Sequence, residues 1–115
     1  VHRFHGDYFE AYKKAANEIE KAIYLAWNND QCYQTAYLKQ LITGSIMAIC
    51  NYYYKTSTLD CFQKRTAVKK LCDDQMLRNA IEKTGFINKQ AKWIVNKKIN
   101  LLILYAKIAN LKHNR

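Results

Sequence analysis

Proline is absent from this sequence of 115 residues, and glycine occurs only three times, at Gly6, Gly44 and Gly85. Tight turns between short strands depend on these two residue types, so their scarcity argues against an all-β domain and favours long helices with short connections. Apolar runs are also short, such as the five residues 101–105 in the C-terminal stretch, and a membrane-spanning helix needs roughly 20. We therefore expect one all-α domain over residues 1–115, a compact bundle of four to five helices.

Signatures of nucleotide-binding and metal sites are missing as well. The three glycines lie far apart, which excludes a phosphate-binding glycine loop. Successive cysteines lie 18, 11 and 11 residues apart, without the short paired spacing of a zinc site or a redox dithiol. Their apolar neighbours predict buried free thiols and hence a reducing, cytoplasmic compartment. The four cysteines are Cys32, Cys50, Cys61 and Cys72.

Potential ligands and acid/base groups gather only near the N-terminus, at His2, Arg3, His5 and Asp7. A metal site needs at least three converging ligands, and a terminal segment without helical period is typical of a frayed end, so we predict no metal site. The adjacent carboxylates Asp73 and Asp74 stand at an expected helix start, which favours capping over catalysis. No catalytic residue is predicted.

Helical periodicity divides the chain into five expected helices, at residues 8–27, 31–54, 59–71, 75–84 and 88–112. The second and the last are the longest. The second is apolar over a wide arc, which is typical of a central helix, and Gly44-Ser45 in its middle indicates close packing or a mild bend. The first helix places one apolar stripe at three- and four-residue spacing: Tyr12, Ala16, Ile19, Ile23 and Trp27.

Cap residues bound the third and fourth expected helices. Ser57 or Thr58 is suited to cap the third, the Asp73-Asp74 pair the fourth, and Gly85 to end it. Alternatively, the two form one kinked helix. The side chains expected to be buried from these two helices are Leu59, Phe62, Val68, Leu71, Met76, Leu77, Ala80 and Ile81.

Positive charge is concentrated towards the C-terminus. Residues 83–115 hold eight basic residues and no Asp or Glu, so they carry +8 of the total charge of +10. The last expected helix has two adjacent apolar stripes, wide enough to serve both a core and a second surface. One stripe is Ile94, Leu101, Tyr105 and Ile108, and the other is Val95, Leu102, Ala106 and Ala109.

Three interpretations of this basic stretch stay open: the solvated face of a core helix, a contact with an anionic membrane surface, and a contact with nucleic acid. The consecutive tyrosines at 52–54 do not form one base-stacking platform, because they point to different sides of a helix. A membrane contact would use five cations and two interfacial aromatic residues: Lys97, Lys98, Lys107, Lys112, Arg115, Trp93 and Tyr105.

The two ends of the chain resemble one known family. The segment Val1-His2-Arg3-Phe4-His5-Gly6-Asp7 is similar to the Tyr-Arg-x-His-x-x-Ser type of segment that closes the catalytic domain of many bacterial family 2 glycosyltransferases. The helical, lysine-rich C-terminal extension common in those enzymes looks like three stretches of this chain: LCDDQMLRNAI at 71–81, WIVNKK at 93–98 and LLILYAK at 101–107. Together they cover the start of the chain and most of it from residue 71 onward.

The resemblance implies a parent enzyme that transfers a sugar from a nucleotide-sugar donor, with a divalent metal, to a surface polysaccharide or lipid-linked acceptor. Arg3 and His5 would border its donor site, and residues 1–6 would be the remnant of the catalytic domain. The sequence departs from the pattern where His5 is followed by Gly6-Asp7 and then Tyr8 in place of the usual Ser. The Asp-x-Asp motif, the donor-binding sheet and the catalytic carboxylate have no counterpart here, so the chain would be inactive alone and hold no cofactor.

As a non-catalytic C-terminal domain, the chain would have three possible partners. It would pack on the upstream catalytic domain, pair subunits as a homo-oligomer, or hold the enzyme against the anionic inner face of the cell membrane. Its location would be cytoplasmic and peripheral to that membrane. The alternative is a small basic helical domain that binds nucleic acid.

Overall fold

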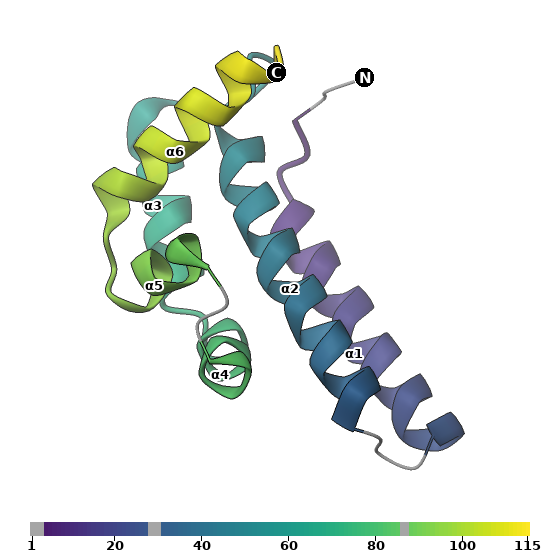
Figure 1. Ribbon diagram of the computed structural model, residues 1–115. Helices are drawn as coiled ribbons and strands as arrows, with labels where there is room; N and C mark the ends of the chain where they lie inside the picture. Colours follow the sequence, from purple (N-terminus) through teal and green to yellow (C-terminus); the bar gives the residue numbers. More distant parts are fainter. Residues whose placement is uncertain (1–3, 28–30, 86–87) are drawn as a thin grey trace.

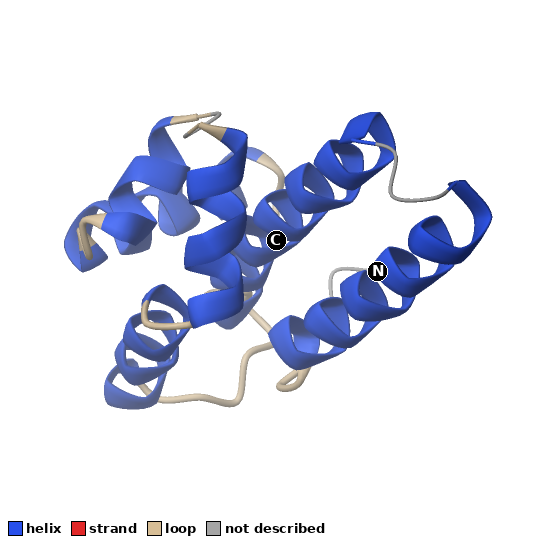
Figure 2. Cartoon of the chain, turned by 90° about the horizontal axis from the view of Figure 1, so that it is seen from below, coloured by secondary structure: helices blue, strands red, loops and turns tan. Residues whose placement is uncertain are grey.

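The computed structural model describes the backbone of residues 4–27, 31–85 and 88–115 and, within these ranges, the side chains outside 23–34. These ranges form helices and no strand, which confirms the all-α class (Figure 2). The described chain has six helices where four to five were expected: α1 (Tyr8–Trp27), α2 (Gln31–Tyr52), α3 (Cys61–Cys72), α4 (Gln75–Thr84), α5 (Lys89–Val95) and α6 (Ile99–Lys112).

Helix α2 is the centre of the molecule, as its wide apolar arc predicts. It packs against α1 on one side and against α3, α4 and α6 on the other (Figure 1). Leu41 and Ile42 are completely buried in this position, and Ile49 and Cys50 almost completely. With 22 residues α2 is the longest helix, and the 20-residue α1, not the last helix, is second.

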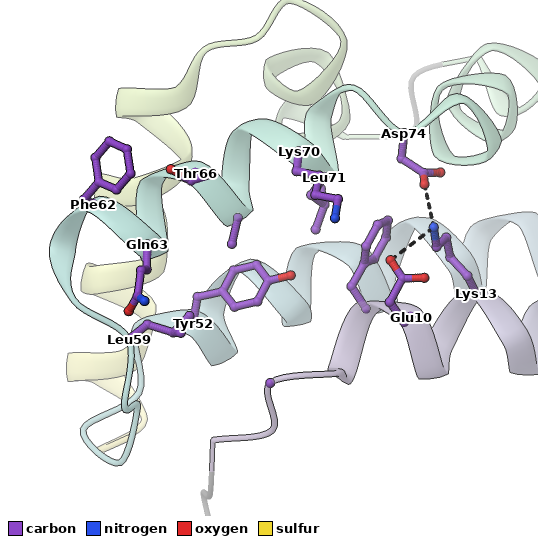
Figure 3. A pocket seen from close by; sticks show the side chains of 13 residues that line it. Glu10, Lys13, Tyr52, Leu59, Phe62, Gln63, Thr66, Lys70, Leu71 and Asp74 are labelled. Carbon is purple, nitrogen blue, oxygen red and sulfur yellow. Dashed lines mark hydrogen bonds and ion pairs between the residues drawn. The ribbon is translucent and has the colours of Figure 1, made fainter.

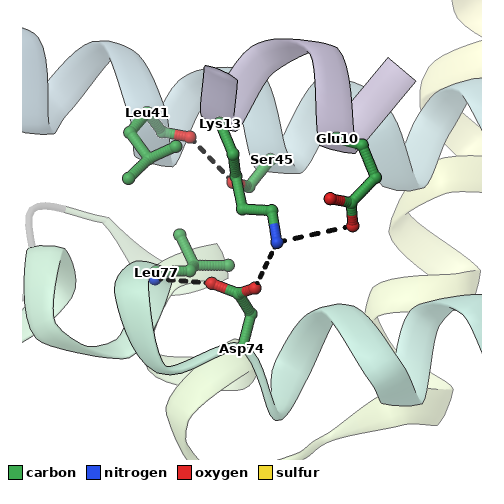
Figure 4. Close-up of polar contacts among 6 residues, drawn as sticks. All are labelled: Glu10, Lys13, Leu41, Ser45, Asp74 and Leu77. Atoms are coloured by element: carbon green, nitrogen blue, oxygen red, sulfur yellow. Dashed lines mark hydrogen bonds and ion pairs between the residues drawn. The ribbon is translucent and has the colours of Figure 1, made fainter. Parts of the chain in front are cut away.

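Close packing of α1 on α2 depends on Gly44. A Cβ atom at this position would overlap the ring of Tyr12 from α1, so the missing side chain makes room for the neighbouring helix. The hydroxyl of the adjacent Ser45 is buried and donates to the carbonyl of Leu41, 2.8 Å away (Figure 4). Of the two expectations for Gly44-Ser45, close packing is confirmed.

Helix α2 ends at Tyr52, two residues earlier than expected. The N–H groups of Tyr53 and Tyr54 donate to the carbonyls three residues before them, at 3.0 and 3.2 Å, which tightens and closes the last turn. The following loop leads to α3.

Helix α3 begins at Cys61 because Asp60, and neither Ser57 nor Thr58, is its N-cap. The Asp60 carboxylate accepts from the N–H of Gln63 at 2.8 Å, and the Gln63 side chain accepts from the N–H of Asp60 at 3.0 Å. This reciprocal capping box satisfies two N–H groups together. The Ser57 hydroxyl accepts instead from Leu59 within the loop.

Helices α3 and α4 are two separate helices, so the alternative of one kinked helix is wrong. Asp74 is the N-cap of α4 and accepts from the N–H of Leu77 at 3.0 Å, and Gly85 ends the helix with a left-handed φ of 73°. Both capping predictions are confirmed. Leu77, Ala80 and Ile81 are buried as expected.

An ion pair ties the start of α4 to α1. Lys13 Nζ lies 2.7 Å from the second carboxylate oxygen of Asp74 and 3.4 Å from Glu10 (Figure 4). Burial alone lowers the pKa of Lys13, but its hydrogen bond to Asp74 and the charges of Asp74 and Glu10 outweigh burial and raise it. The Asp74 carboxylate thus caps α4 and also binds Lys13 of α1.

The prediction of one helix at 88–112 is wrong, because this stretch forms two helices, α5 and α6. After Val95 the chain turns at Lys97, whose φ of 54° is left-handed. The Lys98 N–H donates to the Trp93 carbonyl at 2.8 Å and the Lys97 N–H to Ile94 at 3.2 Å. This pair of bonds is a Schellman motif, which ends α5 and lets α6 start in a new direction.

Burial predictions were wrong at several exposed side chains. Phe62 lies a third of a turn from the buried Val68 on α3 and overhangs a cleft beside α1, so 78% of it is exposed. Ile19, on the outer side of α1, is 46% exposed. Cys61 is exposed because it opens α3, while Cys50 and Cys72 are buried thiols as expected; the side chain of Cys32 lies outside the described residues. The side chains of Ile23 and Trp27 also lie outside the described residues.

Candidate functional site

Charge is divided between two halves of the fold. Residues 1–60, which contain α1 and α2, hold six basic and six acidic residues. Residues 61–115, which contain α3 to α6, hold thirteen basic and three acidic residues and therefore carry the whole net charge of +10. We call residues 61–115 the basic half.

Helix α6 has a buried inner face and an exposed apolar outer face on opposite sides. The inner face is buried and carries Leu102, Ala106 and Asn110, four residues apart. The outer face has four apolar side chains spaced three, four and three residues apart, with exposed fractions from 42% to 78%: Leu101, Leu104, Ile108 and Leu111. We call this outer face the α6 stripe. The sequence left open which side of this helix faces the core, and in the structure α2 and α3 cover the side opposite Leu101 and Ile108.

A first cationic depression lies where α5 meets α6. Its volume is about 240 Å³, and the side chains of Arg65, Lys97 and Lys98 line it together with Leu101. Lys97 Nζ also lies 2.8 Å from Asp73 Oδ1. The hydrogen bond from Lys97 and then its charge hold the pKa of Asp73 below the ordinary value. We call this the junction depression.

A second cationic depression lies at the other end of α6. Its volume is about 290 Å³, and it is lined by Tyr53, Lys55, Lys107, Asn110, Leu111 and Arg115. Two ammonium groups approach the Tyr53 ring, from Lys64 at 5.3 Å and from Lys107 at 5.8 Å. Burial raises the pKa of the Tyr53 hydroxyl. We call this the terminal depression.

Buried hydrogen bonds fix the terminal depression in place. The amide of Asn110 donates to the carbonyl of Cys50 at 2.9 Å, and its oxygen accepts from Arg115 Nε at 3.3 Å. The guanidinium of Arg115 also lies 5.7 Å from the ring centre of Tyr54. Arg115 is thus positioned by Asn110 on α6 and by Tyr54, which follows the end of α2.

No protein-family model, curated protein or solved structure matches this chain.

The predicted contact residues fall into two groups. Lys98, Lys107 and Lys112 are exposed, and the depressions gather Lys97 with Lys98 and Lys107 with Arg115. Trp93 and Tyr105, predicted as interfacial anchors, are only partly exposed and pack against the core.

Three further cations of the site were not predicted. Lys64 and Arg65 come from α3, and Lys55 follows α2. They stand next to the last helix only in the folded chain. In the sequence, Lys55 and the Lys64-Arg65 pair follow tyrosines 52–54, where they indicate phosphate contacts only under the nucleic-acid interpretation.

The segment expected to border a donor site is held against the end of α2. The Phe4 N–H donates to Thr56 Oγ1 at 2.8 Å and the His5 N–H to Asn51 Oδ1 at 3.2 Å. His5 is exposed and lines a depression of about 470 Å³ that runs along α1 and includes Gln40 of α2. Arg3 lies outside the described residues.

A cleft of about 410 Å³ separates the start of α1 from α3 (Figure 3). Tyr52 points across its floor, Phe62 stands at its rim, and the Lys13–Asp74 ion pair is at its far end. Burial, and secondarily the charge of Glu10, raises the pKa of Tyr52 to about 12. Within the described residues, no three His, Cys, Asp or Glu side chains gather as a metal site.

None of the helices, over the residues that the structure describes, combines the length and apolarity needed to cross a membrane.

Proposed function

We propose that this chain is a non-catalytic helical module of a family 2 glycosyltransferase and that it holds the enzyme on an anionic membrane surface through its basic half. The sugar-transfer part of the proposal is supported by the resemblance of residues 1–7 and of the stretches after residue 71. The membrane part is supported by the separation of charge between the two halves of the fold.

The observation that carries the membrane contact is the position of the cations around α6. A depression with basic side chains lies at each end of this helix, and α6 itself contains no Asp or Glu. An anionic surface is attracted by such an arrangement, because each basic residue near an anionic leaflet contributes about 1 kcal/mol. The neutral half, α1 and α2, has no comparable preference.

Vesicle co-sedimentation tests the membrane contact. The chain should bind vesicles that contain phosphatidylglycerol and should not bind vesicles of phosphatidylcholine alone. The variant K98Q/K107Q/K112Q removes three exposed charges from the basic half, so its partition coefficient should fall about 100-fold in low salt.

The control variant is K14Q/K21Q/K39Q, which removes the same charge from exposed positions of α1 and α2. It should bind nearly as well as the original chain. Equal loss in both variants, or equal binding to both kinds of vesicle, would contradict the proposal. Tight binding to DNA or RNA with a steep salt dependence, without lipid binding, would favour a nucleic-acid-binding domain.

A further inference from the structure

The α6 stripe is an apolar surface that the fold leaves uncovered. Its four side chains stand on the side of the helix opposite the buried Leu102 and Ala106. Leu111 is 78% exposed and Ile108 55%, and nothing within the described residues covers them. Since isolated exposed apolar side chains are ordinary but a continuous helical face is not, the stripe indicates a contact surface.

Positive charge surrounds the stripe on every side. Leu101, at its first turn, lines the junction depression with Arg65 and Lys98, and Leu111, at its last turn, lines the terminal depression with Lys107. The 100° rotation per residue places Lys107 along one edge of the stripe and Lys112 along the other. The stripe therefore runs from one cationic depression to the other.

Three partners could cover the α6 stripe: a second copy of the chain, a nucleic acid or a bilayer. The cations around the stripe distinguish between them. A second copy of the chain would bring its own lysines against Lys107 and Lys112, and like charges oppose that pairing. A nucleic acid would satisfy the cations and leave the apolar stripe in water. An anionic bilayer accepts both, since its acyl region takes apolar side chains and its phosphates take the cations.

We infer that α6 lies in the plane of an anionic bilayer interface, with the stripe below the phosphates and the two cationic depressions at their level. This inference rests on the proposed membrane contact and deepens it, because it distinguishes insertion from electrostatic adsorption. The helix has 14 residues, about 21 Å in length, which suits an in-plane helix and is too short to cross the hydrocarbon core.

Monolayer insertion tests the inference without labels. Injected beneath a mixed phosphatidylcholine and phosphatidylglycerol monolayer, the chain should raise the surface pressure, because apolar side chains enter the lipid layer. The variant L104Q/I108Q should give little pressure change and bind anionic vesicles about tenfold more weakly. Both positions are exposed, and circular dichroism checks that the variant remains folded.

A matched control uses apolar side chains exposed elsewhere, in the variant I19Q/F62Q. It should insert like the original chain. Anionic vesicle binding without any rise in surface pressure would overturn the inference while leaving the proposed function intact. Absence of vesicle binding would overturn both. A dimer in sedimentation experiments that L104Q/I108Q dissociates, with no effect on lipid insertion, would assign the stripe to a second copy.

Discussion

Tyr52 occupies the floor of the cleft between α1 and α3, with only 6% of its surface exposed. Burial disfavours its phenolate, and the nearby charge of Glu10 adds to this effect, so its pKa rises from the ordinary value of 10.0 to about 12. Below pH 10 the hydroxyl is protonated in both the folded and the unfolded chain. Between pH 10 and 12 the unfolded chain loses the proton first, so the free energy of unfolding must fall as pH rises.

The variant Y52F should therefore show a shallower alkaline loss of stability. One such tyrosine contributes a slope of up to about 1.4 kcal/mol per pH unit across this interval. Tyr37, whose pKa is also raised to about 12, mainly by burial, leaves a residual slope in the variant. Urea unfolding at pH 9, 10, 11 and 12 measures both. Identical slopes for Y52F and the original chain would contradict the assignment.

Individual residues were predictable where the chemistry is local. Asp74 and Gly85 cap and end α4 as expected, because capping needs only neighbours in sequence. Phe62 was not predictable, since its exposure depends on where α1 lies across the cleft. The cap of α3 is Asp60 and neither Ser57 nor Thr58, and the signal for it in the sequence is the capping-box spacing of Asp60 and Gln63.

At the scale of the elements, the break between α5 and α6 is the main feature that sequence patterns did not show. A Schellman motif commonly places glycine in the left-handed position, and here Lys97 occupies it. No glycine or proline therefore marks the end of α5. The apolar period continues through the break, so a single helix was the natural prediction.

Replacing Lys97 with glycine should stabilise the fold relative to replacing it with alanine. Both variants remove the exposed ion pair with Asp73, while only glycine adopts the left-handed conformation without steric cost. We expect K97G to be about 1 kcal/mol more stable than K97A in urea unfolding. Equal stability of the two variants would mean that the turn relaxes to another conformation when Lys97 is removed.

The sequence likewise did not predict which face of α6 is buried. Both of its faces carry apolar residues at helical spacing, so periodicity alone does not say which one is inward. The buried face is chosen by α2 and α3, which pack against it. The expectation that the last helix has apolar residues for a core and for a second surface agrees with this arrangement.

At the scale of the whole molecule, composition was sufficient for the fold class. The absence of proline and the scarcity of glycine predict an all-α domain, and the wide apolar arc of α2 predicts its central place. The cationic depressions were not predictable, because each combines residues from separate helices or loops. Arg65 from α3 meets Lys98 at the start of α6 only through tertiary packing.

The proposed parentage predicts what lies N-terminal to Val1 in the same polypeptide. We expect alternating strands and helices that carry an Asp-x-Asp motif, as a nucleotide-sugar-binding sheet requires. The full-length protein should transfer sugar from a nucleotide-sugar donor, and this chain alone should not. Determination of the upstream coding sequence tests the first expectation. A different kind of domain there would contradict the parentage but not the lipid contact.

The two ends of the described chain both contact the loop that follows α2, at Lys55 and Thr56. Phe4 donates to Thr56, and the Lys55 ammonium donates to Asn114, 2.9 Å away. The far ends of α1 and α2 lie at the opposite end of the molecule (Figure 1). Any segment joined before Phe4 therefore starts beside the C-terminal end of α6. The height of an attached domain above the bilayer would then not depend on the length of α1 and α2, whose far ends would point away from the point of attachment.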